Sequence, residues 1–262
     1  MMISLVFQKE FKNDFRNPRR FILEILSILL RIFLLFVISN FISANGDIAG
    51  LNTEKFYLFL MLGFLFLETI NNVSASIIRA LQKYKDTGII EQVLKLPIST
   101  ESFLISHALY PSMLMILKFF IYLFLSEIFI ISFLNIHNFL FVSLIYFLFI
   151  LTTIILSVGL TGVSLFIEKP DMLLVVNSIL NLVFGAVFFT AQFLPGFLQL
   201  FSNLFPIFHT LSAARELVLN HTIPDYSFYL LIGLMVLIYG SCSLIFLKKG
   251  LIHAKNKDKL LI

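Results

Sequence analysis

Long apolar runs alternate with shorter polar segments along the whole chain. A helix needs ~20 predominantly apolar residues to cross ~30 Å of hydrocarbon, and six runs of this chain reach that length. The pattern therefore predicts an all-α polytopic membrane protein with six membrane-spanning helices. The spans are expected near residues 20–43, 56–78, 105–134, 139–167, 172–193 and 228–247. The third span contains Pro111 near its start, a residue type that can kink a helix.

The first residues follow a different pattern. Within residues 2–16, three phenylalanines recur every four residues on one side of a helix, and basic residues occupy the other sides. This pattern is typical of an amphipathic helix in the headgroup plane of a membrane, although a cytosolic tail with a few aromatic residues is the alternative. Asn17 followed by Pro18 favours the start of a new helix at that point.

The longest polar interruption between two apolar runs extends from Arg79 to Phe103. Gly88 and Pro97 divide it into a turn and a short amphipathic helix. The apolar face of this helix has no core of its own to enter, so we expect residues 79–103 to contact another molecule outside the membrane. The charged residues of the segment are Arg79, Lys83, Lys85, Asp86, Glu91, Lys95 and Glu101.

A second irregular segment, residues 194–227, separates the last two predicted spans. Three prolines and Gly196 interrupt it, so one spanning helix is excluded and one or two re-entrant or interfacial helices are expected. We also expect Arg215 to have a specific partner, with Glu54 and Glu127 as alternatives to the adjacent Glu216. A merely solvated loop arginine is the competing interpretation.

Three charges fall deep inside the predicted spans, where each costs ~2.5–3.5 kcal/mol on insertion scales. Arg31, Glu68 and Lys118 lie near the middle of the first three spans, and we expect them to form a buried network that could also touch substrate. Glu24 lies near the end of its span and is expected to reach water. Small and polar residues of the fourth and fifth spans, such as Gly159, favour helix packing, with lining of a pathway as the alternative.

Composition agrees with a membrane protein, because 59% of the residues are hydrophobic and only 13% are charged. Of the 19 lysines and arginines, 15 fall on the side that holds both termini and residues 79–103, and two on the other side. This asymmetry predicts that both termini and residues 79–103 are cytoplasmic. The membrane is expected to be the cytoplasmic (inner) membrane. The basic residues form no continuous stripe, so nucleic acid is not an expected partner.

Enzymatic activity is not expected from this chain. All six aspartates lie outside the predicted spans, the five histidines are dispersed, and the phosphate-binding pattern GxxxxGK[ST] is absent. The single cysteine, Cys242, lies in an apolar run and excludes a disulfide within the chain. We therefore expect neither a metal nor a cofactor in this chain, and any ATP hydrolysis must come from another chain.

The loop between the second and third spans carries a family resemblance in Tyr84, Lys85, Gly88, Glu91, Leu94, Pro97, Ile98 and Ser99. This pattern resembles the cytoplasmic loop of ABC type-2 exporter permeases, and Pro206, Arg215 and Glu216 resemble the outer signature of the same family. The resemblance implies one transmembrane domain over residues 1–262, with the fold of the type V exporters. It further implies a coupling helix that rests on the ATPase through Tyr84, Lys85, Asp86, Gly88, Glu91, Leu94 and Pro97.

By the same resemblance, the chain is expected to pair with a second copy or with a paralogous permease, amid membrane lipid. ATP and Mg²⁺ would then be bound by separate ATPase subunits. The expected function is export of an amphiphilic or hydrophobic substrate, such as a drug, a peptide or a lipid-like molecule, out of the cytoplasm. Export of a polysaccharide or glycolipid is the first alternative, and a non-transporting membrane scaffold subunit is the second.

Overall fold

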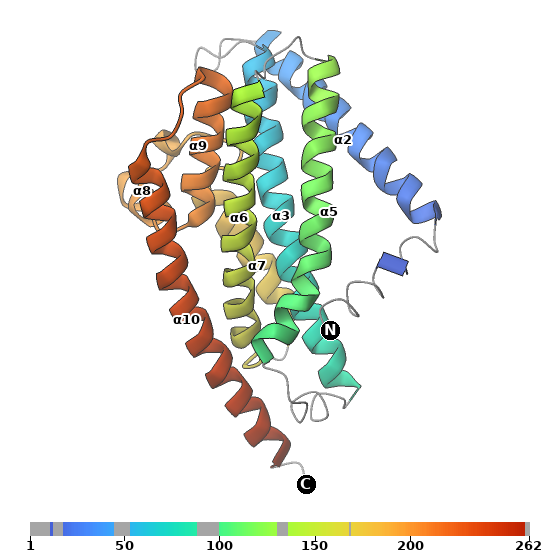
Figure 1. The fold of residues 1–262 in the computed structure, drawn as a ribbon, viewed down its shortest axis with the longest axis vertical. Coiled ribbons are helices and arrows are strands. Elements are labelled where there is room, and N and C mark those ends of the chain that lie inside the picture. The colour runs from blue at the N-terminus through green and yellow to red at the C-terminus, as the bar shows by residue number, and fades with distance from the viewer. Residues whose placement is uncertain are drawn as a thin grey trace.

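A computed structural model describes residues 11–12, 18–44, 53–87, 100–129, 136–167 and 169–259 of the chain. Within these ranges the chain is helical and contains no strand. The long helices form one elongated bundle (Figure 1). The α-helices are α2 (Pro18–Ala44), α3 (Thr53–Asp86), α5 (Thr100–Phe129), α6 (Ile136–Ser164), α7 (Pro170–Phe184), α8 (Gly196–Ser202), α9 (Pro206–Asn220) and α10 (Tyr226–Lys259), with a 3₁₀ helix η1 (Ala191–Phe193) before α8.

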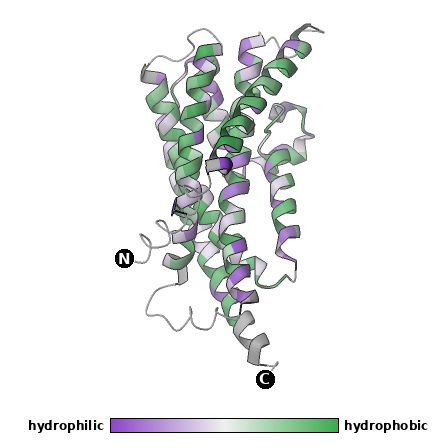
Figure 2. Cartoon of the chain, turned by 90° about the vertical axis from the view of Figure 1, so that its right-hand side faces the viewer, coloured by the Kyte–Doolittle hydropathy of each residue, from purple (hydrophilic) through white to green (hydrophobic). Residues whose placement is uncertain are grey.

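Helix α3 is the centre of the bundle. Of its most apolar stretch 72% is buried, against 22% for α2 and for α10. It packs against α2, α5, α6, α7 and α9 (Figure 1). Hydrophobic residues cover most of the length of the long helices (Figure 2), and the outer faces of α2 and α10 leave many of them exposed. Such exposed apolar faces are stable in lipid or against another membrane chain.

Five helices of the described residues are long and apolar enough to cross a membrane, namely α2, α3, α5, α6 and α10. They correspond to the predicted first, second, third, fourth and sixth spans. Their ends differ from the predicted ones by several residues, and α3 and α10 both continue well past the predicted limits. The chain is thus a polytopic helical membrane protein, and Pro111 lies inside the continuous helix α5.

The predicted fifth span over residues 172–193 is wrong as a continuous helix. Helix α7 ends at Phe184 after 15 residues, which is ~22 Å of helix and short of the ~30 Å of hydrocarbon. The backbone N–H groups of Ala186 and Val187 fold back onto carbonyl groups of the last helical turn, and Ala186 has a φ of 49°. This arrangement terminates a helix. The residues that follow are as apolar as the helix itself, so hydropathy carries no sign of the break.

The segment 194–227 contains two short helices, α8 and α9, where one or two were predicted. Pro206 begins α9, and His221 in the left-handed region (φ 56°) ends it. Helix α9 packs against α3 and α6, alongside the upper half of α6 in Figure 1, and buries most of its residues. The Tyr239 hydroxyl of α10 donates a hydrogen bond to the Leu204 carbonyl, which fixes the link between α8 and α9.

Small residues allow α6 and α10 to approach closely. A Cβ atom on Gly162 would lie 2.5 Å from the backbone nitrogen of Leu247, and one on Gly159 would lie 2.5 Å from the Ser243 hydroxyl oxygen. Backbone-to-backbone contact of this kind is typical of small residues at membrane helix interfaces. Of the two interpretations of these glycines, helix packing is therefore the one that matches their position.

Two predicted elements fall partly or mostly outside the described residues. Of the interfacial helix at residues 2–16, only Phe11 and Lys12 are described, and both are helical and exposed. Of the loop at residues 79–103, the part between Thr87 and Thr100 is outside the described ranges. Both elements remain predictions.

Candidate functional site

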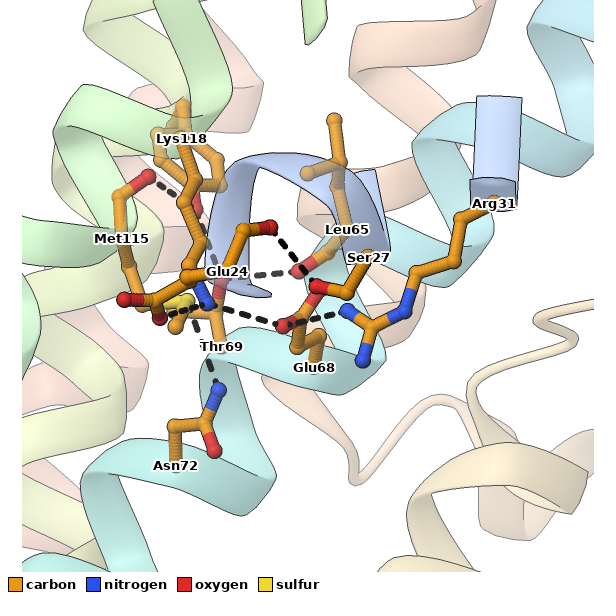
Figure 3. A network of polar contacts seen from close by, with 10 residues as sticks. Glu24, Ser27, Arg31, Leu65, Glu68, Thr69, Asn72, Met115 and Lys118 are labelled. Carbon is orange, nitrogen blue, oxygen red and sulfur yellow. Dashed lines mark hydrogen bonds and ion pairs between the residues drawn. The ribbon is translucent and has the colours of Figure 1, made fainter. Parts of the chain in front are cut away.

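Helices α2, α3 and α5 bring charged side chains to one place inside the bundle (Figure 3). Glu24 and Arg31 are seven residues apart on α2, which is two helical turns and therefore the same face. Glu68 lies midway along α3 and Lys118 midway along α5. Each of these three helices therefore contributes at least one charged side chain to the same place in the bundle.

The four side chains form a chain of alternating charge. Arg31 Nη1 donates to Glu68 Oε1 at 2.8 Å, and Lys118 Nζ reaches the same oxygen at 3.2 Å. Lys118 Nζ also lies 2.7 Å from Glu24 Oε1. The Glu68 and Lys118 side chains are each only 10% exposed, whereas Arg31 is 40% and Glu24 36% exposed. The two most buried charges therefore each have an oppositely charged partner.

The sequence predicts that Arg31, Glu68 and Lys118 meet, and the structure brings these three side chains together. Glu24 was expected to reach water, and it joins the network as a fourth member while remaining partly exposed. Its seven-residue spacing from Arg31 is the signal that could have placed both residues on the face that meets α3 and α5.

A cavity of about 500 Å³ adjoins this charge network. It lies between α2, α3 and α5, and its lining combines the four charges with polar groups of Ser27, Asn72 and Ser76. Pockets that hold small molecules have volumes of ~300–1,000 Å³. The cavity is therefore large enough for a small ligand, and the four charges that join α2, α3 and α5 form part of its lining.

Hydroxyl groups hold the helices around the network in place. Thr69 Oγ1 lies 2.6 Å from the Tyr146 hydroxyl, which in turn donates to the Met115 carbonyl at 3.3 Å. Ser74 on α3 and Ser157 on α6 share a hydrogen bond of 2.8 Å. These buried contacts join α3 to α5 and α6, so the charges project from a firmly packed support.

Arg215 on α9 is buried, and carbonyl oxygens are its partners. Its Nη1 donates to the Ala186 carbonyl at 2.8 Å, and its Nη2 donates to the carbonyls of Val187 (2.5 Å) and Phe59 (3.1 Å). The carbonyls at 186 and 187 need donors because helix α7 has ended before them. Arg215 therefore connects α9 to α3 and to the segment that follows α7.

The prediction of a carboxylate partner for Arg215 is wrong, since none of Glu54, Glu127 and Glu216 forms its contacts. The competing prediction of a solvated arginine is wrong too, because the residue is 7% exposed. Glu216 is itself exposed, and Pro206 serves as the first residue of the helix that carries Arg215. The correct partners are backbone atoms of an unwound segment, which residue types do not reveal.

The end of α3 that leads into the predicted coupling loop packs against the start of α5. The Tyr84 ring lies 5.2 Å from the Phe103 ring and 5.7 Å from the His107 ring, measured between centroids. Phe103 and His107 are 5.1 Å apart. This aromatic cluster holds together the two helices that flank the loop. Four of the predicted coupling residues, Gly88, Glu91, Leu94 and Pro97, lie outside the described residues.

The same end of α3 also meets the turn between α6 and α7. Lys85 lines a small cleft of about 50 Å³ together with Ser164 and Pro170. Arg79 lies 3.7 Å from Asp171 at the start of α7, although both side chains are largely exposed. Asp86 is the last residue of α3. This end of α3 therefore lies against the start of α5 and the start of α7.

Among the described residues, no group of three or more His, Cys, Asp or Glu side chains is placed to hold a metal ion. The described residues thus form a polytopic helical membrane protein in which a charge network joins three helices and a polar cavity lies between them.

The family model for "ABC-2 type transporter" matches residues 2–219. The match covers most of the 262 residues, and the chain belongs to the ABC-2 type transporter family. This confirms the family resemblance carried by the loop and by residues near Arg215. The chain is thus a transmembrane permease subunit of an ABC transporter, and subunits of this family are typically non-catalytic and act with ABC ATPases. A search among curated proteins finds no match.

Proposed function

We propose that the chain is the permease of an ATP-driven exporter that moves an amphiphilic or hydrophobic substrate out of the cytoplasm. The observation that carries this proposal is the family match over residues 2–219. In this proposal ATP and Mg²⁺ are bound by a separate ATPase chain, and two permease chains, identical or paralogous, assemble in the inner membrane. Both termini and residues 79–103 face the cytoplasm, as the distribution of lysine and arginine predicts.

The packing at the end of α3 supports a coupling role for the loop. Because Tyr84 contacts Phe103 and His107 across the two ends of the loop, a push on the loop displaces α3 and α5 together. Helix α3 is the central helix of the bundle and carries Glu68. In this proposal, a movement of the end of α3 therefore displaces Glu68 and the cavity wall directly, through the same helix.

An amphiphilic substrate fits the chemistry of the cavity. Polar and charged groups line it, and apolar residues such as Leu114 and Met115 occupy the same wall. A ligand is transported only if its affinity differs between the inward-open and outward-open states. In the proposal, ATP-driven displacement of α3 and α5 changes the spacing of Glu68 and Lys118, and with it the affinity for the polar end of the substrate.

The test is co-purification of the full-length chain with a soluble ATPase, followed by measurement of ATPase stimulation. We expect the wild-type chain to retain and stimulate the ATPase, and the variants Glu91→Arg and Gly88→Pro in the predicted loop to abolish stimulation. The variant Glu54→Arg, at an exposed position at the opposite end of α3, is the matched control and should leave it unchanged. A chain that binds no ATPase, or a Glu91→Arg variant with normal stimulation, would contradict the proposal.

A further inference from the structure

The cavity beside the charge network is electrically balanced. Two acidic residues, Glu24 and Glu68, and two basic residues, Arg31 and Lys118, line it and pair with one another. Arg79 adds a fifth charge to the lining, and Asp171 lies 3.7 Å from it. The four charges of the network therefore sum to zero, and the fifth charge, on the largely exposed Arg79, has the equally exposed Asp171 as its neighbour.

This balance discriminates between ligands. A ligand with a single net charge would leave one charge of the site without a counterion, which is costly for partly buried groups. A ligand with one positive and one negative group keeps the total at zero, and each of its charges can meet an opposite one in the lining. The cavity therefore favours a zwitterion over an anion or a cation.

The network also has unused hydrogen-bonding groups on both sides. Glu68 Oε2 is buried and has no hydrogen-bond partner within the described part of the chain, although the other oxygen of the same carboxylate accepts from two cations. Arg31 uses only Nη1 for Glu68, and 40% of its side chain remains exposed. A buried acceptor without a donor is unfavourable, so an N–H or O–H donor of a ligand would be stabilised by a hydrogen bond to Glu68 Oε2.

The helices that carry this polar lining also expose apolar side chains on their other faces. On α5, Met113 and Leu117 are exposed and stand next in sequence to the lining residues Leu114 and Lys118. On α2, Leu30 is exposed and precedes Arg31. A molecule whose polar end occupies the cavity can therefore keep an apolar chain against the outer faces of α2 and α5.

We propose that the cavity between α2, α3 and α5 binds the zwitterionic headgroup of an amphiphile, with its ammonium group at Glu68 and its anionic group at Arg31. The headgroup can come from a resident membrane lipid or from an exported substrate, which share this chemistry. The second source rests on the proposed function, whereas binding itself does not. The experiment therefore measures binding and ATPase stimulation separately.

The purified full-length protein in maltoside micelles is titrated with three single-chain amphiphiles of equal chain length, and bound species are counted by native mass spectrometry. The probes are lysophosphatidylethanolamine (zwitterionic), lysophosphatidylglycerol (anionic) and an alkyltrimethylammonium (cationic). We expect the wild-type protein to bind the zwitterion about tenfold more tightly than either charged probe. Equal binding of all three probes, or tightest binding of a charged one, would overturn the proposal.

Two variants should shift the preference in opposite directions. Glu68→Gln leaves the lining with one excess positive charge and should favour the anionic probe, whereas Lys118→Met leaves one excess negative charge and should favour the cationic probe. The matched controls Glu54→Gln and Lys55→Met, at exposed positions on α3, should keep the wild-type order. A purely structural network would lower stability in both cavity variants without reversing the order of the probes, and that result contradicts the proposal.

Ala75→Phe provides a variant that retains every charge. Ala75 lines the cavity, so a phenyl ring there should occupy the space and weaken binding of the zwitterion at least about tenfold. Unchanged binding would overturn the proposal. The second measurement is ATPase activity in the presence of the zwitterion. If the zwitterion stimulates the ATPase and Ala75→Phe abolishes this stimulation, the headgroup belongs to a transported substrate. If the zwitterion binds without stimulating the ATPase, it belongs to a resident lipid. Loss of probe selectivity with normal ATPase coupling would refute the site alone, whereas selective binding without any ATPase partner would refute the exporter proposal alone.

Discussion

The guanidinium carbon of Arg215 lies 3.4 Å from the centroid of the Phe59 ring, and the same guanidinium donates to the Phe59 backbone carbonyl. One side chain of α9 thus contacts both the ring and the main chain of one α3 residue. Cation–π attraction strengthens when the charge is removed from water, as it is here. Arg215 is therefore the main polar connection between the α8–α9 segment and the central helix.

Replacing Arg215 with lysine should destabilise the fold. The rigid, planar guanidinium reaches three carbonyls at once, whereas an ammonium on a flexible stem cannot reproduce that fork. Each buried carbonyl left without a donor costs ~1–3 kcal/mol, so we expect a clearly lower thermal unfolding temperature in detergent micelles, with Arg215→Met lower still.

The control for this prediction is Glu216→Gln, at the adjacent exposed position, which should leave the unfolding temperature unchanged. If Arg215→Lys unfolds at the wild-type temperature, then the contacts to the carbonyls of Ala186 and Val187 do not stabilise the end of α7.

Glu68 and Lys118 should show strong energetic coupling in a double-mutant cycle. Glu68→Gln removes the negative charge that Arg31 and Lys118 share, and breaking a fully buried ion pair costs ~3–5 kcal/mol. We expect a smaller loss here, because Arg31 is 40% exposed. The double variant Glu68→Gln with Lys118→Met should be more stable than the sum of the single changes predicts, by ~0.5–3 kcal/mol. Additive losses in thermal unfolding would show that the two charges do not interact.

Gly162 on α6 should not tolerate a larger side chain. A Cβ atom there would lie 2.5 Å from the backbone of α10, so Gly162→Leu forces the two helices apart, and overpacking of this kind costs ~1–3 kcal/mol. We expect a lower unfolding temperature and a smaller peak of folded protein in size-exclusion chromatography. Gly233→Ala on α10 is the matched control, because its added Cβ meets nothing within 4 Å. Equal behaviour of the two variants would contradict the close α6–α10 contact.

Tyr84→Ala should uncouple the loop from the bundle. The ring of Tyr84 contacts Phe103 and His107, and such aromatic pairs contribute ~0.5–1.5 kcal/mol beyond burial alone. If the loop transmits force through this cluster, the variant should keep its ATPase partner but lose most of the stimulation. Tyr84→Phe retains the ring and should behave as wild type. Full stimulation in Tyr84→Ala would place the transmission elsewhere.

Much of the fold follows from hydropathy, because a backbone in hydrocarbon must satisfy its own hydrogen bonds and a helix of sufficient length is the simplest way to do so. The runs that became α2, α3, α5, α6 and α10 are recognisable for this reason. The end of α7 is not, since the turn at Ala186 uses apolar residues and depends on backbone geometry. Hydropathy measures side chains only, and it cannot record which backbone groups are left without a helical partner.

The sequence by itself determined that Arg31, Glu68 and Lys118 had to find partners, because an unpaired charge inside a membrane is too costly to leave. It also determined the family, through the spacing of residues in the loop. Only the tertiary structure decided that Glu24 completes the network and that Arg215 binds carbonyls rather than a carboxylate. The reason is physical: a charge requires some compensating group, but which one lies within reach depends on how the helices are packed.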